Sequence, residues 1–423
     1  MRLRRSLTAA VAALLCTAIA VAQTPTPQPV AKPAPAVPRP AMPVPAAPGD
    51  ASASYQPVPP APTIPGKAWI LLDYTSGQVI AGSNMDARLE PASITKVMTG
   101  YVVAAEMKNG KIRPGDDVTI SERAWKEGGA GTEGSFSALV LNSKVKLDDV
   151  LHGLIIQSGN DAAIALAEHV AGSEEAFVDL MNQYAARLGM TNSHFINSHG
   201  LSAPGHYMSA RDIAILSRAL ISEFPQEYAI YKVKEFTYNG IRQYNRNELL
   251  SRDASVDGIK TGHTDGAGYC LAASAVRGDQ RLISVVLGID AKSSKQGFRE
   301  REDSNLALLN WGFRFFETHT LYAANARVAK VKVWKGKANS IVLGTALPVQ
   351  VVIPRGSYGR LKPVMDVPKQ VIAPIARGQR IGTLRVMLNG VVLQQRPLIA
   401  LTEIKEAGFF GRMWDDFMMW WKS

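Results

Sequence analysis

The sequence predicts an α+β protein, in which a helical cluster packs on an antiparallel sheet and is followed by a small all-β domain and a C-terminal amphipathic helix. Hydrophobic residues recur at helical spacing through the middle of the chain and alternate at strand spacing on either side of it. Short β-rich runs separated by Gly and Pro follow from residue 325 to 402. Helices in the middle with strands at both ends indicate one sheet assembled from distant segments.

The N-terminal region is predicted to export the protein and then to tether it. Three arginines within the first five residues, an apolar stretch and the small residues Ala20-Val21-Ala22 are typical of a signal peptide over residues 1–22. Residues 23–65 are rich in Pro and Ala, so we expect an extended, partly polyproline tether. The chain of 423 residues is 46% hydrophobic, which leaves enough sequence after the tether for two globular domains.

Composition also excludes several kinds of site and partner. Without the signal peptide, Cys270 is the only cysteine, so no intramolecular disulfide can form and we expect this residue to pack as a small apolar side chain. The seven histidines include no His-x-x-x-His pair on a plausible helix, and we predict neither a metal nor a cofactor. The net charge of +11 comes from scattered residues of an exported chain, which favours an anionic membrane surface over nucleic acid as the partner.

The first elements of the chain place two polar motifs at helix ends. Residues 69–73 and 78–81 predict a hairpin, and apolar residues from Ile94 to Ala105 then recur at helical spacing, which puts Ser93 at a helix N-terminus. A second helical pattern stops at Ser158-Gly-Asn160 and another helix starts at once, so these residues occupy a tight turn. The later expected elements are helices over 174–188 and from Ser209, a hairpin turning at Asn239-Gly240, strands at 258–260, 269–276 and 281–289, a helix over 299–318, and β runs at 331–334, 349–353 and 383–388.

Three motifs occur in order: Ser93-Ile-Thr-Lys96, Ser158-Gly-Asn160 and Lys260-Thr-Gly262. A serine hydroxyl is a poor nucleophile without an adjacent base, and the i to i+3 spacing on a helix puts Lys96 beside Ser93. An ammonium cannot accept a proton, so Lys96 must be neutral for part of the reaction. Burial lowers a lysine pKa, and a second cation such as Lys260 lowers it further.

The other motif residues suggest how a substrate is held. Ser158 can relay a proton toward a leaving amine, and Asn160 can hydrogen-bond either the substrate amide or Lys96. Gly262 has no side chain, so an extended substrate can lie along that edge strand, with its oxyanion at the backbone N–H groups of Ser93 and His263. His199 and His206 lie in a loop with Gly and Pro and are expected to be structural or exposed.

These motifs and the segments around them resemble the low-molecular-mass penicillin-binding proteins that act as serine D-alanyl-D-alanine carboxypeptidases. The resemblance covers residues 66–318 and implies a penicillin-binding/β-lactamase-like transpeptidase domain, while the β domain and terminal helix follow the family layout. The matching segments include Glu90-Pro-Ala-Ser-Ile-Thr-Lys96, Ile156-Gln-Ser-Gly-Asn-Asp-Ala162 and Val256-Asp-Gly-Ile-Lys-Thr-Gly-His-Thr-Asp-Gly-Ala-Gly-Tyr269.

The resemblance implies removal of the terminal D-alanine from peptidoglycan pentapeptide stems, with β-lactam antibiotics as covalent inhibitors. It implies acylation of Ser93 with Lys96 as general base. Further implied residues are Ser158 and Asn160 as proton relay and substrate contacts, and Lys260, Thr261 and His263 on the substrate side. Arg246 and Arg301 match family arginines that bind near the cleft, and Arg299 competes with Arg301 as the contact for the substrate carboxylate.

Three other functions remain open from the sequence. A D,D-endopeptidase that cuts crosslinks differs in cleft shape and not in motif. A class A β-lactamase uses the same motifs, but its Glu-x-x-Leu-Asn sequence does not occur between Asn160 and Lys260. A catalytically silent wall-binding scaffold is disfavoured by the intact Ser93, Lys96 and Lys260.

The predicted domains are therefore a catalytic domain over residues 66–318, a β domain over 319–402 and an amphipathic helix over 403–423. From Phe409 the apolar residues fall at 409, 410, 413, 414, 417, 418 and 421, too short a stretch to span a membrane. We expect residues 406–423 to lie in the lipid interface and hold the periplasmic enzyme on the outer face of the inner membrane. Docking of this helix on the β domain is the alternative.

Overall fold

The computed structural model describes residues 57–422, and the predicted signal peptide lies outside them. Of the predicted tether, residues 57–65 are described and form no helix or strand. The Pro59 carbonyl accepts a hydrogen bond from the Trp311 indole at 3.1 Å, and Ile64 packs against the core. This end of the predicted tether therefore lies against the first domain, because an indole N–H and an apolar side chain both gain partners there.

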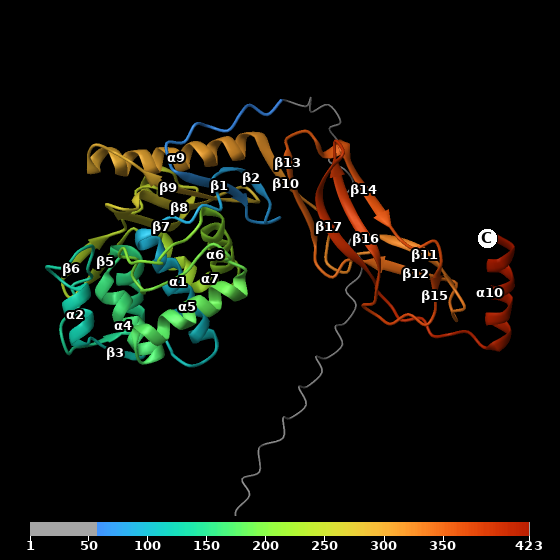
Figure 1. Cartoon of the computed structure of the whole chain (residues 1–423), viewed down its shortest axis with the longest axis horizontal. Helices are drawn as coiled ribbons and strands as arrows, with labels where there is room; N and C mark the ends of the chain where they lie inside the picture. The colour runs from blue at the N-terminus through green and yellow to red at the C-terminus, as the bar shows by residue number, and fades with distance from the viewer. Residues whose placement is uncertain (1–56, 423) are drawn as a thin grey trace, which may run out of the picture. The chain divides into compact units, whose positions relative to one another are not determined.

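A five-stranded antiparallel sheet organises the first domain, in the order β2-β1-β9-β8-β7 (Figure 1). Its strands are β1 (Ala68–Asp73), β2 (Val79–Ser83), β7 (Val256–Thr264), β8 (Gly268–Arg277) and β9 (Gln280–Ile289). The register pairs Ile70 of β1 with Val285 of β9, so the sheet joins segments far apart in sequence, as predicted. β7 lies at the edge of this sheet.

Seven helices pack on one face of the sheet. They are α1 (Thr95–Lys108), α2 (Glu122–Gly128), α3 (Leu147–His152), α4 (Asn160–Ala171), α5 (Glu174–Leu188), α6 (Ala210–Glu223) and α7 (Pro225–Tyr228). Three short helical turns complete this layer: the 3-10 turns η1 (Ala92–Ile94) and η3 (Ala229–Lys232), and the π-helical turn η2 (Gly153–Gln157). It also contains two pairs of short strands, β3 (Asp117–Thr119) with β4 (Lys144–Lys146) and β5 (Glu235–Tyr238) with β6 (Ile241–Tyr244). The short α8 (Leu249–Arg252) lies on the other face, where Leu249 and Leu250 are buried in a cluster with Leu308. The predicted α5, the Ser209 cap of α6 and the Asn239-Gly240 hairpin turn are confirmed.

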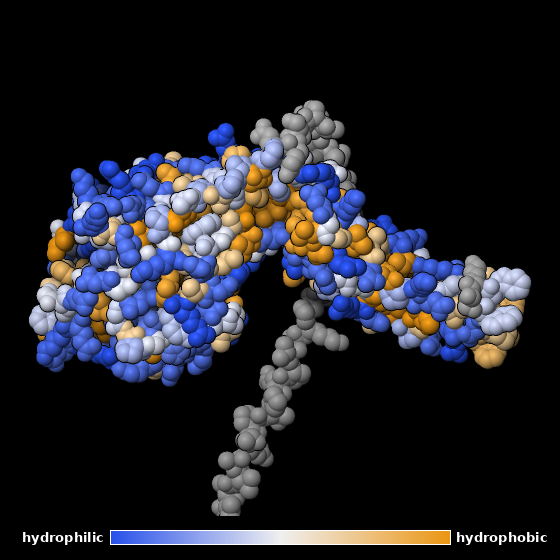
Figure 2. Space-filling model, turned by 45° about the horizontal axis from the view of Figure 1, so that its top comes forward, coloured by the Kyte–Doolittle hydropathy of each residue, from blue (hydrophilic) through white to orange (hydrophobic). Residues whose placement is uncertain are grey.

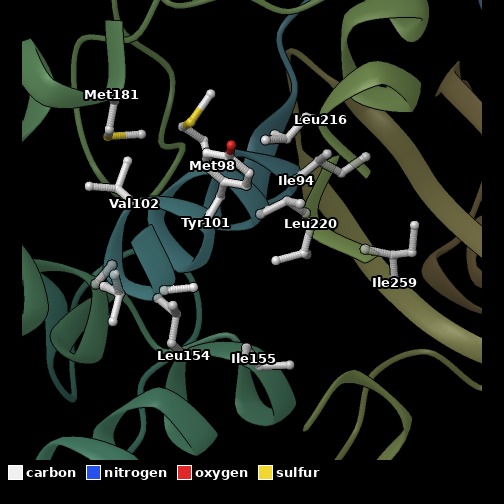
Figure 3. Packing of buried hydrophobic residues seen from close by; sticks show 14 of the residues in the cluster. Ile94, Met98, Tyr101, Val102, Leu154, Ile155, Met181, Leu216, Leu220 and Ile259 are labelled. Carbon is white, nitrogen blue, oxygen red and sulfur yellow. The ribbon is translucent and has the colours of Figure 1, made fainter. Parts of the chain in front are cut away.

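Helix α1 forms the centre of the domain. Every residue from Thr95 to Glu106 is buried, so the helix is covered on all sides and not along one stripe. Figure 3 shows side chains of α1, among them Met98 and Val102, surrounded by residues of other elements such as Met181 and Leu220. A site at the N-terminus of this helix therefore stands on a rigid support.

Helix α9 (Ser294–Phe315) covers the other face of the sheet (Figure 1). Its Leu308 and Leu309 are fully buried in a cluster with strand residues such as Leu271. The predicted range, 299–318, was wrong at both ends. Ser293 caps the start by accepting a hydrogen bond from the Gln296 backbone N–H, and the chain turns into a strand at Phe316, whose backbone pairs with Pro354.

The second domain is the predicted small β domain. Its strands are β10 (Phe316–Tyr322), β11 (Ala329–Trp334), β12 (Ser340–Gly344), β13 (Val349–Pro354), β14 (Leu361–Asp366), β15 (Val371–Ile372), β16 (Arg380–Leu388) and β17 (Val391–Ala400), with a short turn η4 (Tyr358–Arg360). Six of them form a sheet in the order β14-β16-β17-β12-β11-β15, and β10 pairs with β13. Helix α10 (Phe409–Lys422) ends the described chain. Within residues 57–422, no helix combines the length and apolar character needed to cross a bilayer.

The packing of α9 on the sheet predicts a large cost for truncating Leu309. Leu309→Ala is expected to lower the free energy of unfolding of the first domain by about 2–5 kcal/mol, because it leaves a cavity in a closed cluster. Hydrogen–deuterium exchange of the slowest amides in β8 and β9 measures this change. Val276→Ala, at a 36% exposed position of the same sheet, is the control and should cost less than about 1 kcal/mol. Equal effects of the two changes would contradict the proposed role of α9.

Candidate active site

Ser93 lies in the turn η1, directly before α1. Ala92, the first residue of this turn, has a φ of 48°, which lies in the left-handed region. Ser93 is only partly buried, whereas Lys96, one turn further on, is 1% exposed. The Lys96 Nζ is 2.9 Å from the Ser93 Oγ, which confirms that the i to i+3 spacing brings the two groups together.

Lys96 contacts only neutral groups. Besides Ser93 Oγ, its Nζ donates to the Asn160 Oδ1 at 2.7 Å and to the His199 carbonyl at 2.7 Å. Burial lowers the pKa of Lys96 from about 10.5 to about 7; the Asp161 carboxylate opposes this shift, and the Arg246 guanidinium adds to it. Arg246 is thus a second cation that lowers the pKa of Lys96, while the repulsion between Lys96 and Lys260 lowers the pKa of Lys260.

The three contacts match the donors and acceptors of a neutral amine. A neutral lysine has two N–H donors and one lone pair. Two donors suffice for the Asn160 and His199 oxygens, so the lone pair can point at the Ser93 hydroxyl and accept its proton. The geometry thus provides a base aimed at a nucleophile.

The turn Ser158-Gly-Asn160 joins η2 to α4, as the sequence predicted. Ser158 is buried and adopts a left-handed conformation with φ 68°. Both ends of the Asn160 amide are engaged, since its Nδ2 donates to the Glu133 carbonyl at 3.1 Å while its Oδ1 accepts from Lys96. Of the two partners expected for Asn160, the structure therefore shows Lys96.

Strand β7 brings the third motif beside the serine. Lys260 and Thr261 are buried, and His263 is exposed with its ring stacked on Tyr269, their centroids 4.1 Å apart. A Cβ placed on Gly262 would come 2.7 Å from the Pro91 carbonyl oxygen. This glycine is thus needed for close packing of β7 on the serine turn, a role that the sequence interpretation, which assigned its missing side chain to substrate access, did not include.

Two arginines extend the cationic side of the site. Arg301, on α9, is 5% exposed and donates to the Arg246 carbonyl at 3.2 Å, while Arg246 donates to the Gln157 carbonyl at 3.1 Å. Burial, together with the positive charges of Lys96, Arg246 and Arg301, lowers the pKa of Lys260 well below its ordinary value. Arg299 lies on the exposed side of the same helix. The structure therefore places Arg301, and not Arg299, in this cluster.

Residues 55–291 match the family model for D-alanyl-D-alanine carboxypeptidase, and residues 316–406 match the model for the C-terminal domain of penicillin-binding protein 5. D-alanyl-D-alanine carboxypeptidase DacC of Escherichia coli is 50% identical over 363 residues, which cover 85% of this chain and 89% of that protein. The chain belongs to the D-alanyl-D-alanine carboxypeptidase family.

Solved structures agree with this assignment. Penicillin-binding protein 5 from Haemophilus influenzae has a TM-score of 0.78 at 40% identity, covering 82% of this chain and 99% of that one. Penicillin-binding protein D2 from Listeria monocytogenes, solved in a cefotaxime-bound form, has a TM-score of 0.53 at 26% identity over 60% of this chain and all of that one. The predicted fold and the predicted activity, a serine-type D-alanyl-D-alanine carboxypeptidase of the penicillin-binding type, are therefore confirmed.

Sequence reasoning missed two groups that shape the site of this carboxypeptidase. The His199 carbonyl reaches Lys96 because Gly200, with φ 93°, lies where a Cβ would come 2.0 Å from the Ala92 carbonyl oxygen. Asp161 accepts hydrogen bonds from the backbone N–H groups of Ser137 and Leu139, which ties the loop between α2 and β4 to the site. The only signals in the sequence were the pair His199-Gly200 for the first group and, for the second, the position of Asp161 directly after the Ser-Gly-Asn motif.

Three side chains to which sequence reasoning gave no catalytic role, His199, His206 and Cys270, behave as expected. The His206 ring accepts from the Ile196 N–H and contacts Thr95 Oγ1 at 2.8 Å; burial lowers the pKa of His206 to about 4 and that of His199 to about 3, so both rings are neutral and structural. Cys270 is fully buried, and burial raises the pKa of its thiol to about 11.

The lowered pKa of Lys96 predicts a pH dependence for acylation by penicillin. The second-order rate should fall as pH decreases through about 7, because protonation removes the lone pair that accepts the serine proton. Asp161 raises the pKa of Lys96, so Asp161→Asn should move this acidic limb to lower pH. Asp117→Asn, on the surface strand β3, is the control and should leave the limb in place. A rate that is flat between pH 5 and 9 would exclude Lys96 as a base of this pKa.

Proposed function

We propose that this carboxypeptidase removes the terminal D-alanine from peptidoglycan pentapeptide stems by acylation of Ser93, with Lys96 as the general base. The observation that carries the proposal is the 2.9 Å contact between the Ser93 hydroxyl and a buried amine whose pKa is lowered to about 7. A substantial fraction of such an amine is neutral near pH 7, whereas an exposed lysine is almost entirely protonated there.

The reaction then proceeds in two halves. The Ser93 Oγ attacks the carbonyl of the penultimate D-alanine as Lys96 takes its proton, and the backbone N–H groups of Ser93 and His263 stabilise the oxyanion. Ser158 passes the proton from Lys96 to the amine of the departing D-alanine. Lys96 is neutral again and can deprotonate the water that hydrolyses the acyl-enzyme.

The cationic cluster is suited to the substrate terminus. Lys260, Arg246 and Arg301 lie near one another, and the only acidic group paired with them in the described chain is Glu302, 3.7 Å from Arg301. A substrate carboxylate would supply the missing negative charge and align the scissile bond with Ser93, with Thr261 and the edge of β7 holding the peptide. A β-lactam carries a comparable carboxylate, which supports covalent inhibition at the same serine.

We further propose that α10 anchors the periplasmic enzyme to the outer face of the inner membrane. Asp415 accepts from the Lys335 backbone N–H and Asp416 pairs with the Lys335 ammonium at 2.5 Å, so the acidic side of the helix faces the β domain. The aromatic side is left exposed, with Phe410 at 78% and Trp420 and Trp421 at 72%. This orientation supports a lipid interface and argues against docking of the apolar stripe on the β domain.

Ser93→Ala is expected to abolish covalent labelling by fluorescent penicillin, because the acylated oxygen is removed. Lys96→Arg, which keeps a cation but cannot accept a proton, should lower the labelling rate by at least about 100-fold. Ser294→Ala, at an exposed position of α9, is the control and should label normally. Labelling retained at another residue would contradict the assignment. Mass spectrometry of products from a pentapeptide ending in D-Ala-D-Ala shows in the same preparations whether free D-alanine is released.

Truncation before Glu406 is expected to release the enzyme from the membrane fraction. Each large side chain that α10 buries in lipid contributes about 1.5–3 kcal/mol against water, so removing them abolishes attachment. Because every proposed active-site residue precedes Gly312, the truncated enzyme should still release D-alanine from a soluble peptide. Persistence of the shortened protein in the membrane pellet would show that another segment holds it there.

A further inference from the structure

The positive charge of the chain is concentrated in its β domain. Residues 316–406 contain 14 Lys and Arg against 4 Asp and Glu, a net charge of +10. Residues 57–315 contain 26 basic and 29 acidic residues, a net charge of −3. Basic residues occur along the whole sequence, but only in the catalytic domain are they balanced by a similar number of acidic residues.

The β domain cannot neutralise this charge internally. Four carboxylates cannot pair with fourteen cations. Three of the four form described ion pairs with an Arg or Lys, namely with Arg355, Lys405 and, in α10, Arg412. The remaining like charges repel one another in a small domain, which is a cost unless an anionic partner offsets it.

Part of this charge lies where α10 joins the β domain. The Ala407 N–H donates to the Lys335 carbonyl, and the Lys337 N–H donates to the Lys405 carbonyl, so the segment leading to α10 runs along the turn after β11. Lys337 and Lys405 lie on these segments and Lys332 lies in β11 just before the turn; all three are exposed, Lys405 at 74%. These three lysines form the cationic surface at the root of α10.

The same root holds the helix with its aromatic side outward. Lys335 binds Asp415 and Asp416, and Phe409 and Trp414 are 67% and 64% exposed. Figure 2 shows α10, with its pale and orange surface, at the C-terminal end of the chain, and many blue hydrophilic residues on the β domain. A helix whose aromatic rings reach the headgroup level brings cations attached at its root to the same level.

We propose that the cationic surface at the root of α10 binds anionic phospholipid headgroups, so that the enzyme prefers anionic over neutral membranes. The proposal rests on the anchoring role of α10 proposed above. Lipid is favoured over a wall polymer because Lys405 is only four residues before Phe409, the first residue of a helix whose aromatic side chains are exposed. Each lysine near an anionic surface strengthens binding about fivefold, and the gain decreases as salt increases.

The test is co-sedimentation of the purified protein with vesicles of phosphatidylcholine alone or of phosphatidylcholine and phosphatidylglycerol in equal parts. The unmodified protein should bind the anionic vesicles at least about tenfold more tightly, with the difference reduced at high salt. The triple variant Lys332→Gln, Lys337→Gln, Lys405→Gln should lose at least about tenfold on anionic vesicles and keep its binding to neutral ones. The matched control is Lys144→Gln, Lys292→Gln, Lys295→Gln, which removes the same charge from exposed positions of the catalytic domain and should bind as the unmodified protein does.

The outcomes separate this proposal from the anchor itself. Equal binding of the unmodified protein to both vesicles, or an undiminished preference in the triple variant, overturns the headgroup proposal and leaves the anchor standing. No binding to either vesicle overturns both. If the triple variant loses binding to isolated peptidoglycan and not to anionic vesicles, the surface serves the wall and the lipid proposal is wrong. Unchanged penicillin labelling in every variant shows that the proteins are folded.

Discussion

The site depends on one physical constraint, a lysine that is buried without a carboxylate in contact. Water would solvate the ammonium form of Lys96, and the protein offers it only a hydroxyl, an amide oxygen and a backbone carbonyl. Neutral acceptors satisfy an amine well and an ammonium poorly, so burial shifts the equilibrium toward the form that can accept a proton. Asp161 lies close enough to limit the shift, which keeps the pKa near 7 and not lower.

Three chain segments pack closely around this environment, each at a glycine, and two of them approach the turn before α1 directly. A Cβ on Gly159 would come 2.0 Å from the Ser137 Oγ, one on Gly200 the same distance from the Ala92 carbonyl oxygen, and one on Gly262 2.7 Å from the Pro91 carbonyl oxygen. The segments come from the turn before α4, the loop before α6 and the edge strand β7. Close backbone packing is therefore the means by which Asn160 and His199, which are 64 and 103 positions from Lys96, both reach its amine.

The electrostatics of the two domains differ in kind. In the catalytic domain the charges nearly balance overall, and the cations Lys260, Arg246 and Arg301 are gathered near Lys96, where we propose that a substrate carboxylate offsets their repulsion. In the β domain the excess of positive charge is spread over the surface, and α10 is held there through Lys335. The first arrangement suits recognition of one small anion, and the second suits an extended anionic surface.

The sequence by itself determined the α+β order, most helices, the hairpin turns and the Ser93–Lys96 pair, because periodicity, capping residues and i to i+3 spacing are local properties. It also identified the family, since three motifs in order are specific. It could not show that the His199 carbonyl contacts Lys96, that Arg301 and not Arg299 lies in the cationic cluster, or that Gly262 is required for packing. Nor could it give the correct ends of α9. These depend on which segments meet in space, and in particular on strand pairing between Phe316 and Pro354 and on the face of α9 that is buried. A lysine pKa near 7 was likewise decided by the tertiary structure, because burial and the distances to Asp161 and Arg246 exist only in the folded chain.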